Sequence, residues 1–205
     1  TVNATLGSTY EFFAYANGTV NAESEHINLT VEENVAPLVS LTVTPQAINQ
    51  TQTSVLAATV TDDSAVNVTF RVTDPGTMVT DYNDNVPPFS YDYDTIITTN
   101  VGTYFVQAIV TDVYGNVNDS ETSSFSVSDV TPPIFSNNNS GSPTFFEDSV
   151  TISIDVSDNM QLNTVGVQTN LTGPGGVKVY RSLSHVGGGT FQRTFNVDSV
   201  GTYEW

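Results

Sequence analysis

Alternation of apolar and polar residues at every second position is the main pattern of this chain. Val150, Ile152, Ile154 and Val156 alternate with polar residues, and residues 104–110 carry a second series of this kind. A period of two puts successive side chains on opposite faces of a strand, so that one face is buried and the other is exposed to solvent. No apolar stripe with helical spacing extends beyond one turn. The pattern therefore predicts an all-β protein.

The same short landmarks return along the chain at a spacing close to 96 residues. They are Gly7–Phe12, Gly102–Val106 and Gly201–Trp205, then Val60–Asp63 and Val156–Asn159, then Ala36–Val39 and Pro132–Phe135. The second and third sets are each offset by 96 residues, and the tyrosines of the first set are separated by 94 and 99 residues. Agreement among independent landmarks indicates an internal repeat. A unit of this length with about seven short strands predicts tandem immunoglobulin-like β-sandwiches.

The repeat frame divides the chain into three expected pieces. Residues 1–34 hold the last two strands of one unit, 35–130 form a complete sandwich, and 131–205 form a sandwich that ends within its sixth strand. One interpretation is an ordered stretch of a much longer chain. The other is a filament subunit, in which residues 1–34 complete the open sandwich of a neighbouring copy by strand addition. Both ends contain the start of the sixth strand, so the two pieces overlap, which speaks against the second interpretation.

The Gly-Thr-Tyr landmark carries a family resemblance. Its tyrosine occupies the tyrosine-corner position of an immunoglobulin-like domain. Two residues later, where antibody domains have a cysteine, this chain has Phe12, Val106 and Trp205. With the junction Ser128–Phe135, this resembles the cysteine-free immunoglobulin-like and fibronectin type III-like repeats of bacterial and archaeal surface proteins. The resemblance implies an extracellular, cell-surface location in a surface layer, stalk or filament.

Charge and composition exclude several other classes of protein. The net charge is −18 with four Lys and Arg residues in total, which leaves no basic surface for nucleic acid. No apolar run approaches the length of a membrane-spanning helix, so we expect no membrane insertion by this segment. The chain has no cysteine and two histidines, His26 and His185, at non-equivalent places of the repeat. Without a recognisable catalytic motif, we expect no enzyme activity.

Carboxylates and amides gather at the predicted strand ends. Turns at one end of a sandwich lie close together, and hard oxygen ligands on loops suit Ca²⁺, which also relieves repulsion in an acidic chain. The more common role of Asp and Asn at such places is to satisfy the backbone of turns, so both interpretations stay open. The candidate ligands are Asp62, Asp63, Asp112, Asn116, Asn118, Asp129, Asp158 and Asn159.

A second acidic segment, Asp81–Phe89, resembles the Asp-x-Asn-Asp-Asn-x-Pro-x-Phe linker of cadherins, which binds Ca²⁺ between domains. The repeat frame places this segment in the middle of a unit, so we interpret it as an Asp/Asn-rich loop, with a local cation site as the alternative. Its candidate ligands are Asp81, Asn83, Asp84 and Asn85.

Eight Asn-x-Ser/Thr acceptors predict N-glycosylation if the chain is exported. They are Asn3, Asn17, Asn28, Asn49, Asn67, Asn118, Asn138 and Asn170. The sequence thus favours a non-catalytic structural segment of a long extracellular repeat protein, with neighbouring domains and copies of itself as partners. The alternative is an adhesin that binds glycans or other cells through its loops, with Tyr82–Tyr93 as the candidate loop.

Overall fold

The computed structural model describes residues 4–141, 145 and 147–205, and the regular structure of these residues is β-strand throughout. Among them there is no helix long and apolar enough to cross a membrane. The chain divides into two compact units, Thr1–Ser128 and Asp129–Trp205. The prediction of an all-β protein is confirmed, and the boundaries predicted for the individual domains stay predictions.

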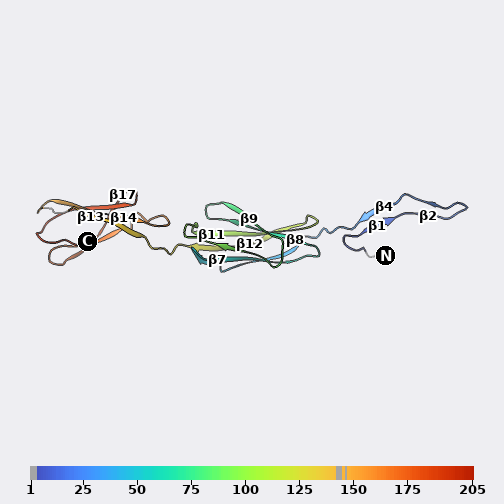
Figure 1. The fold of residues 1–205 in the computed structure, drawn as a ribbon, viewed down its shortest axis with the longest axis horizontal. Coiled ribbons are helices and arrows are strands. Elements are labelled where there is room, and N and C mark those ends of the chain that lie inside the picture. The colour runs from blue at the N-terminus through green and yellow to red at the C-terminus, as the bar shows by residue number, and fades with distance from the viewer. Residues whose placement is uncertain (1–3, 142–144, 146) are drawn as a thin grey trace. The chain divides into compact units, whose positions relative to one another are not determined.

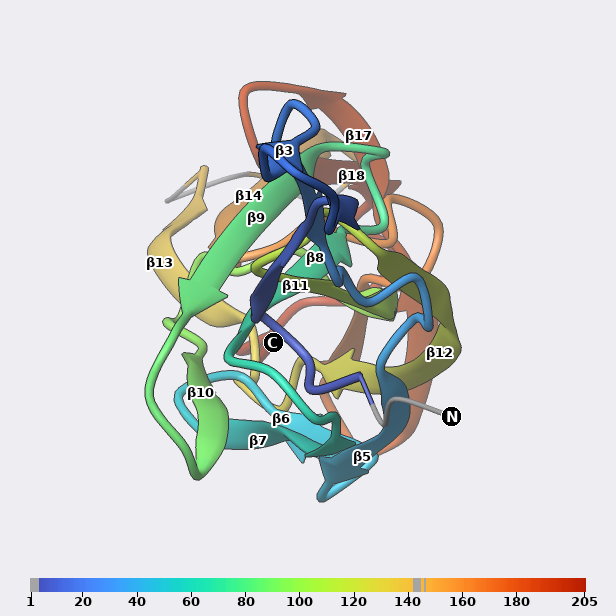
Figure 2. The ribbon, with the colours of Figure 1, turned by 90° about the vertical axis from the view of Figure 1, so that its right-hand side faces the viewer.

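Eight strands of the first unit form two facing sheets (Figure 1). The strands are β5 (Leu38–Thr44), β6 (Ala47–Asn49), β7 (Thr53–Thr61), β8 (Val66–Thr73), β9 (Val79–Asp84), β10 (Phe89–Asp94), β11 (Gly102–Asp112) and β12 (Val117–Ser128). One sheet has the order β10-β7-β5 and the other the order β6-β12-β11-β8-β9, and the two layers are seen end-on in Figure 2. The paired strands are antiparallel except β6, which runs parallel to β12. This arrangement is an immunoglobulin-like sandwich, as predicted. We call it the complete sandwich.

The core of the complete sandwich lies between its two sheets because every second residue of the central strands points inward. The inward residues Val68 and Phe70 of β8 are fully buried, and so are Tyr104 and Val106 of β11. Leu56 of β7 meets them from the opposite sheet and is also fully buried. Burial of apolar surface, worth about 25 cal/mol per Å², is the main force that holds the two layers together.

The tyrosines of the repeated landmark make the backbone hydrogen bond of a tyrosine corner. The Tyr104 hydroxyl donates to the carbonyl oxygen of Asn100 at 2.7 Å. Tyr203 makes the same bond in the second unit, to the carbonyl four residues upstream, at 3.2 Å. In the first repeat, the Tyr10 hydroxyl accepts a hydrogen bond from the backbone N–H of Thr5 at 2.7 Å. The resemblance that rested on this tyrosine is therefore reflected in the local geometry of all three copies.

A hairpin precedes the complete sandwich in the first unit. Its strands β1 (Thr9–Phe12) and β4 (Ile27–Thr30) pair antiparallel, and the shorter β2 (Tyr15–Ala16) and β3 (Ala22–Glu23) pair beyond them. No residue of these four strands is buried. We call residues 7–31 the N-terminal hairpin.

The described residues of the second unit form two separate sheets. One has the order β13-β14-β18-β17 and the other is the pair β15-β16, and residues of both line one apolar pocket. The strands are β13 (Ile134–Ser140), β14 (Ser149–Ser157), β15 (Gln168–Thr172), β16 (Lys178–Ser182), β17 (Ser184–Gly187) and β18 (Thr190–Asn196). Ile152 and Phe191 are its most buried large side chains, at 1% and 0% exposure. We call residues 129–205 the open sandwich.

The segment Tyr82–Tyr93 is not the loop that the sequence suggested. Strands β9 and β10 include all of it except residues 85–88. The rings of Tyr82 and Tyr91 stack with centroids 3.9 Å apart, and Tyr93 packs against Tyr104 at 5.6 Å. Burial, followed by the neighbouring tyrosines, raises the pKa of Tyr82 and of Tyr93 to about 12. These rings belong to the edge of the core, so the adhesin interpretation loses its candidate loop.

Candidate metal site

Two turns at one end of the complete sandwich each present an aspartate. Asp62 directly follows β7, and its Oδ1 accepts hydrogen bonds from the backbone N–H and the hydroxyl of Ser64, at 2.8 and 2.6 Å. Asp112 is the last residue of β11, and its Oδ1 accepts the backbone N–H groups of Tyr114 and Asn116. Aspartates of this kind shape tight turns by bonding to the backbone two residues on. The turns thus hold both carboxylates in fixed positions.

The Asp112 carboxylate is almost fully buried, at 6% exposure, and is surrounded by hydrogen-bond donors. Its Oδ2 also accepts a hydrogen bond from the Asn116 side-chain amide at 2.7 Å. Burial by itself would raise the pKa of Asp112, but hydrogen bonds from Asn116, Tyr114 and Gly115 together outweigh burial and hold the pKa below its usual value.

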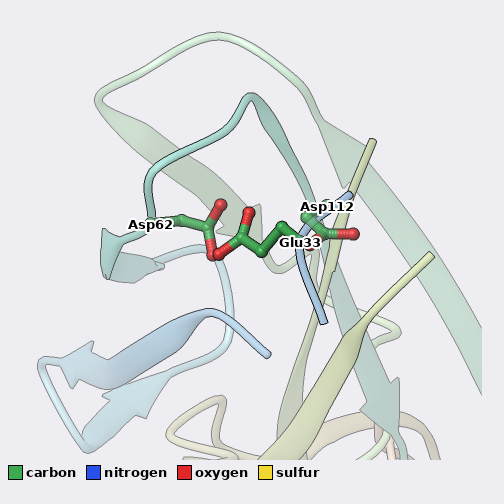
Figure 3. A group of neighbouring side chains, drawn as sticks. All are labelled: Glu33, Asp62 and Asp112. Atoms are coloured by element: carbon green, nitrogen blue, oxygen red, sulfur yellow. The ribbon is translucent and has the colours of Figure 1, made fainter. Parts of the chain in front are cut away.

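A third carboxylate, Glu33, comes from the segment that leads into the complete sandwich. One carboxylate oxygen each from Glu33, Asp62 and Asp112 lies within 4.8 Å of the others. Figure 3 shows the Glu33 side chain reaching between the two aspartates. The backbone carbonyl of Glu33 also accepts a hydrogen bond from the Asn116 side chain at 3.3 Å. Three separate segments therefore bring oxygen atoms to one place, which we call the acid cluster.

One oxygen of the acid cluster is left without a hydrogen bond. Glu33 Oε2 is buried and has no hydrogen-bond partner in the described part of the chain. Burial raises the pKa of Glu33, and the charges of Asp62, Asp112 and Asp63 raise it further, while hydrogen bonding to Ser64 opposes them. A buried carboxylate oxygen surrounded by like charges is unfavourable unless a cation or proton compensates it. The cluster fits a hard divalent cation such as Ca²⁺, which prefers carboxylate and carbonyl oxygens.

The structure thus brings together some of the ligands expected from the sequence. Asp62 and Asp112 meet, Asn116 orients Asp112, and the charge of Asp63 acts on Glu33. Asn118 does not join them, because its side-chain amide donates to the Pro37 carbonyl at 2.8 Å. Sequence reasoning missed Glu33. Glu33 lies 96 residues, one repeat, before Asp129, which was among the candidates, and this offset is the signal that would have found it.

The open sandwich groups its own candidates in the corresponding place. The Asn159 side-chain amide donates to Asp129 Oδ1 at 3.3 Å. Asp129 Oδ1 also accepts the backbone N–H of Thr131, and Asp158 Oδ1 accepts that of Met160, both at 2.9 Å. Within this unit, Asp129 and Asn159 are therefore neighbours, as the strand-end pattern predicts.

The residues of the cadherin-like segment are engaged in a sheet. Asp81, Asn83 and Asp84 belong to strand β9 and not to a loop, which corrects that expectation. Asp81 forms a two-bond ion pair with Arg71 at 2.8 and 2.9 Å, and this pair lowers the pKa of Asp81. Asn83 Oδ1 accepts the Thr69 hydroxyl across the strands at 2.6 Å.

The rest of this segment forms a turn. Asp84 accepts the backbone N–H groups of Val86 and Ser90, at 3.1 and 2.9 Å, so its carboxylate closes the connection between β9 and β10. Asn85 is exposed at that connection. Because neighbouring residues of β9 point to opposite faces, Asp81, Asn83, Asp84 and Asn85 do not converge on one point.

The glycosylation acceptors differ in accessibility. Asn17, Asn28, Asn67 and Asn138 are exposed, whereas Asn49, Asn118 and Asn170 are partly buried. The Asn170 side-chain oxygen is buried, and the Asn118 amide is held by Pro37. Asn3 lies outside the described residues. Attachment at any of these asparagines stays a prediction.

No protein-family model and no curated protein matches the chain. Among solved structures, it is similar to the FN1–FN3 domains of chicken CNTN1, with 12% identity and a TM-score of 0.38 over 92% of this chain and 65% of that one. It is similar to the fibronectin(III)-like modules of Clostridium thermocellum CbhA, with 15% identity and a TM-score of 0.37 over 77% and 78% of the two chains. It also resembles part of a 1.5-MDa bacterial ice-binding adhesin, with 14% identity and a TM-score of 0.34 over 80% and 55%. These similarities concern the sandwich fold alone.

Proposed function

We propose that the chain is a non-catalytic structural segment of a long extracellular repeat protein, such as a surface layer, a stalk or a filament. Tandem immunoglobulin-like sandwiches without cysteine, an acidic surface and several exposed glycosylation acceptors support this proposal. Such sandwiches host many roles, so the specific role must be argued from the site. The acid cluster is that site, and it lies where the chain enters the complete sandwich.

The two histidines support the non-catalytic part of the proposal. His26 stacks on Phe13 with ring centroids 4.5 Å apart and contacts Glu11 through Nδ1 at 2.7 Å. His185 belongs to the open sandwich and packs against Phe191 at 5.1 Å. Each histidine therefore has a local structural contact in its own unit, and neither contact pairs a base with a nucleophile among the residues that the structure describes.

In this proposal, Ca²⁺ bound at the acid cluster fastens the entering segment to the sandwich. Glu33 comes from the entering segment, Asp62 from the β7–β8 turn and Asp112 from the end of β11. An ion that binds all three ties three chain segments together and neutralises their repulsion. The joint is stiff when the ion is bound. It loosens on chelation because the three carboxylates then repel one another.

The observation that carries the proposal is the buried Glu33 Oε2. A glutamate used only for solubility would extend into water, as the neighbouring exposed Glu32 does. Glu33 instead turns a carboxylate oxygen into a buried place beside two other acids. Bound cation gives that arrangement a physical reason, because it compensates both the lost hydration and the repulsion.

The test compares Glu33→Gln with the adjacent control Glu32→Gln, since each removes one negative charge from the same segment. We expect calorimetry to show Ca²⁺ binding to the wild-type chain and to Glu32→Gln at extracellular millimolar calcium. Glu33→Gln should weaken this binding by at least about tenfold, because the number of charged ligands sets the affinity. Equal Ca²⁺ affinity in both variants, or no binding to the wild-type chain, would refute the cation site.

A second measurement examines the joint itself. Amide hydrogen exchange of residues 31–37 should slow when Ca²⁺ is added to the wild-type chain, because bound segments open less often. The same residues should show no response in Glu33→Gln. A calcium effect confined to other parts of the chain would mean that the ion binds elsewhere and that the joint is not its target.

A further inference from the structure

The sequence contains a single Asn-Gly pair, Asn17-Gly18, which lies in the connection between β2 and β3. Both residues are exposed. The connection runs from Ala16, the last residue of β2, to Ala22, the first residue of β3, and these two alanines pair with each other. The two strands are only two residues long, and all their residues are exposed. Asn17 and Gly18 therefore belong to a weakly held tip of the N-terminal hairpin.

An asparagine that precedes glycine can lose its side-chain amide without an enzyme. The backbone nitrogen of the glycine attacks Cγ of the asparagine, a C–N bond forms, and the side-chain amide leaves as ammonia. The product is a cyclic succinimide. Water then opens the ring at either carbonyl and leaves aspartate or isoaspartate. Glycine favours the attack because it has no Cβ beside the attacking nitrogen and adopts a wide range of backbone angles.

The surroundings of Asn17 leave both reacting groups accessible. Within the part of the chain that the structure describes, no hydrogen bond holds the Gly18 N–H or the Asn17 side chain. The N–H must lose its proton before the nitrogen attacks, so a hydrogen bond there would oppose the reaction. Segments with few buried contacts open locally at low cost in free energy. The connection can thus reach the backbone angles that bring the Gly18 nitrogen close to Asn17 Cγ.

Exposure alone does not create this combination. Asn28 is also exposed, but it lies within β4 opposite Glu11 of β1, and Leu29 follows it. Strand pairing fixes the backbone there, and the Leu29 side chain crowds the attacking nitrogen. The Asn118 amide is held by the Pro37 carbonyl at 2.8 Å. Asn17 differs from both asparagines in its neighbour and in its freedom to move.

We propose that Asn17 is a site of spontaneous deamidation. Asn17-Gly18-Thr19 is also an Asn-x-Thr acceptor, and both modifications involve the same side-chain nitrogen. Deamidation removes the nitrogen to which a glycan would attach, and an attached glycan crowds the amide and slows its loss. The two fates of Asn17 therefore exclude each other. This inference is independent of the cation proposed at the acid cluster.

The reaction changes both the charge and the backbone of the hairpin tip. Either product adds one carboxylate to a chain whose net charge is already −18. Isoaspartate also lengthens the backbone by one carbon atom between residues 17 and 18. The longer connection should disturb the pairing of Ala16 with Ala22, which the short strands on either side support only weakly.

The test uses the full chain produced without glycosylation and incubated at neutral and at mildly alkaline pH. A protease that cleaves after glutamate, used in mildly acidic buffer to stop the reaction, releases residues 12–23 with Asn17 and residues 26–32 with Asn28. Mass spectrometry should show residues 12–23 gaining the mass difference between NH₂ and OH, while residues 26–32 keep their mass. The gain should be faster at the higher pH, because the attacking nitrogen must lose its proton.

Two outcomes of this measurement would overturn the proposal. One is that residues 12–23 and 26–32 gain mass at the same rate, or that neither gains any. The other is that fragmentation of residues 12–23 places the change at Asn21 and not at Asn17. Chromatography should separate two products, aspartate and isoaspartate. Aspartate alone would indicate direct hydrolysis of the amide and would contradict the succinimide route.

Gly18→Ala tests the role of the glycine. A Cβ at residue 18 would meet only the Val20 carbonyl oxygen, at 3.6 Å, and the Gly18 backbone lies outside the left-handed region. The variant therefore fits without strain and keeps the Asn-x-Thr acceptor. We expect it to lose the Asn17 amide several-fold more slowly than the wild-type chain, because the Cβ crowds the attacking nitrogen.

Gly166→Ala is the matched control, since its Cβ also has only ordinary contacts, the nearest being the Asn163 side chain at 3.5 Å. This variant should lose the Asn17 amide as fast as the wild-type chain. If Gly18→Ala reacts as fast as Gly166→Ala, the Gly18 nitrogen is not the attacking group and the proposal fails.

Discussion

Replacing Tyr104 by phenylalanine isolates the tyrosine corner of the complete sandwich. The ring is buried among Phe125 and Tyr93, with centroids 5.0 and 5.6 Å away, and Tyr104→Phe keeps these contacts. The change removes only the hydroxyl and its 2.7 Å hydrogen bond to the Asn100 carbonyl. A buried hydrogen bond contributes about 1 kcal/mol net to the free energy of unfolding. For a domain of this size, that loss lowers the melting temperature by about 4–8 °C.

The single tryptophan gives this experiment an internal control. Trp205 belongs to the second unit, so its fluorescence follows the open sandwich, while tyrosine signals in near-ultraviolet circular dichroism are dominated by the first unit. We expect Tyr104→Phe to lower the tyrosine-detected transition and leave the tryptophan-detected one unchanged. Tyr15→Phe, at a side chain 55% exposed, is the matched control and should change neither transition. If Tyr104→Phe is as stable as Tyr15→Phe, the corner bond does not stabilise the fold and the reasoning fails.

Three further predictions concern charge. In chelator, Glu33→Gln should have a higher melting temperature than the wild-type chain, because it relieves repulsion in the acid cluster. Added Ca²⁺ should raise the melting temperature of the wild-type chain and leave that of Glu33→Gln unchanged. A lower melting temperature of Glu33→Gln in chelator would contradict this reasoning. Burial raises the pKa of Tyr82 and of Tyr93 from 10.0 to about 12 in the folded chain. The stability that the protonated tyrosines contribute is therefore fully present below pH 10 and is lost as the pH rises through about 12. Tyrosinate absorbance should rise together with unfolding. Arg71→Leu should cost at most about 1 kcal/mol in chemical denaturation, because the pair with Asp81 is partly exposed, and salt should reduce this cost. The lowered pKa of Asp81 means that this contribution is present above its usual pKa and disappears as acid protonates it.

Period-two alternation predicted the strands because it reports directly on burial. Ile152 and Val156 alternate with polar residues, and the structure buries them on one face of β14. The same signal was present in Phe89, Tyr91 and Tyr93, which alternate with polar residues along β10. The density of Asp and Asn upstream, and the cadherin-like motif, favoured a loop there. In the structure, cross-strand bonds such as Thr69 to Asn83 accommodate these polar residues on the outer face of a sheet.

The acid cluster could be predicted only in part. Asp62 and Asp112 stand at strand ends, where a fold expectation is enough to place them near one another. Glu33 lies in an irregular segment, and no local pattern shows which way such a side chain turns. Its burial depends on how that segment crosses the sandwich end, held by the bond from Asn116 to the Glu33 carbonyl. Tertiary contacts of this kind are absent from sequence periodicity.

The repeat nevertheless carries information about the joint. A shift of 96 residues moves Glu33 onto Asp129 and Asp62 onto Asp158, so an acid recurs both in the entering segment and after the second strand of the sandwich. Acids that served only solubility could occupy any outward position, because a solvated charge has the same effect at any place on a solvent-exposed face. Recurrence at these two places, with Asp129 contacting Asn159, the neighbour of Asp158, indicates that these acids have a common role at the entry to each sandwich. The repeating element of this chain is then a sandwich together with its acidic entry, and the cation proposed for the first joint has a corresponding pair of acids at the second.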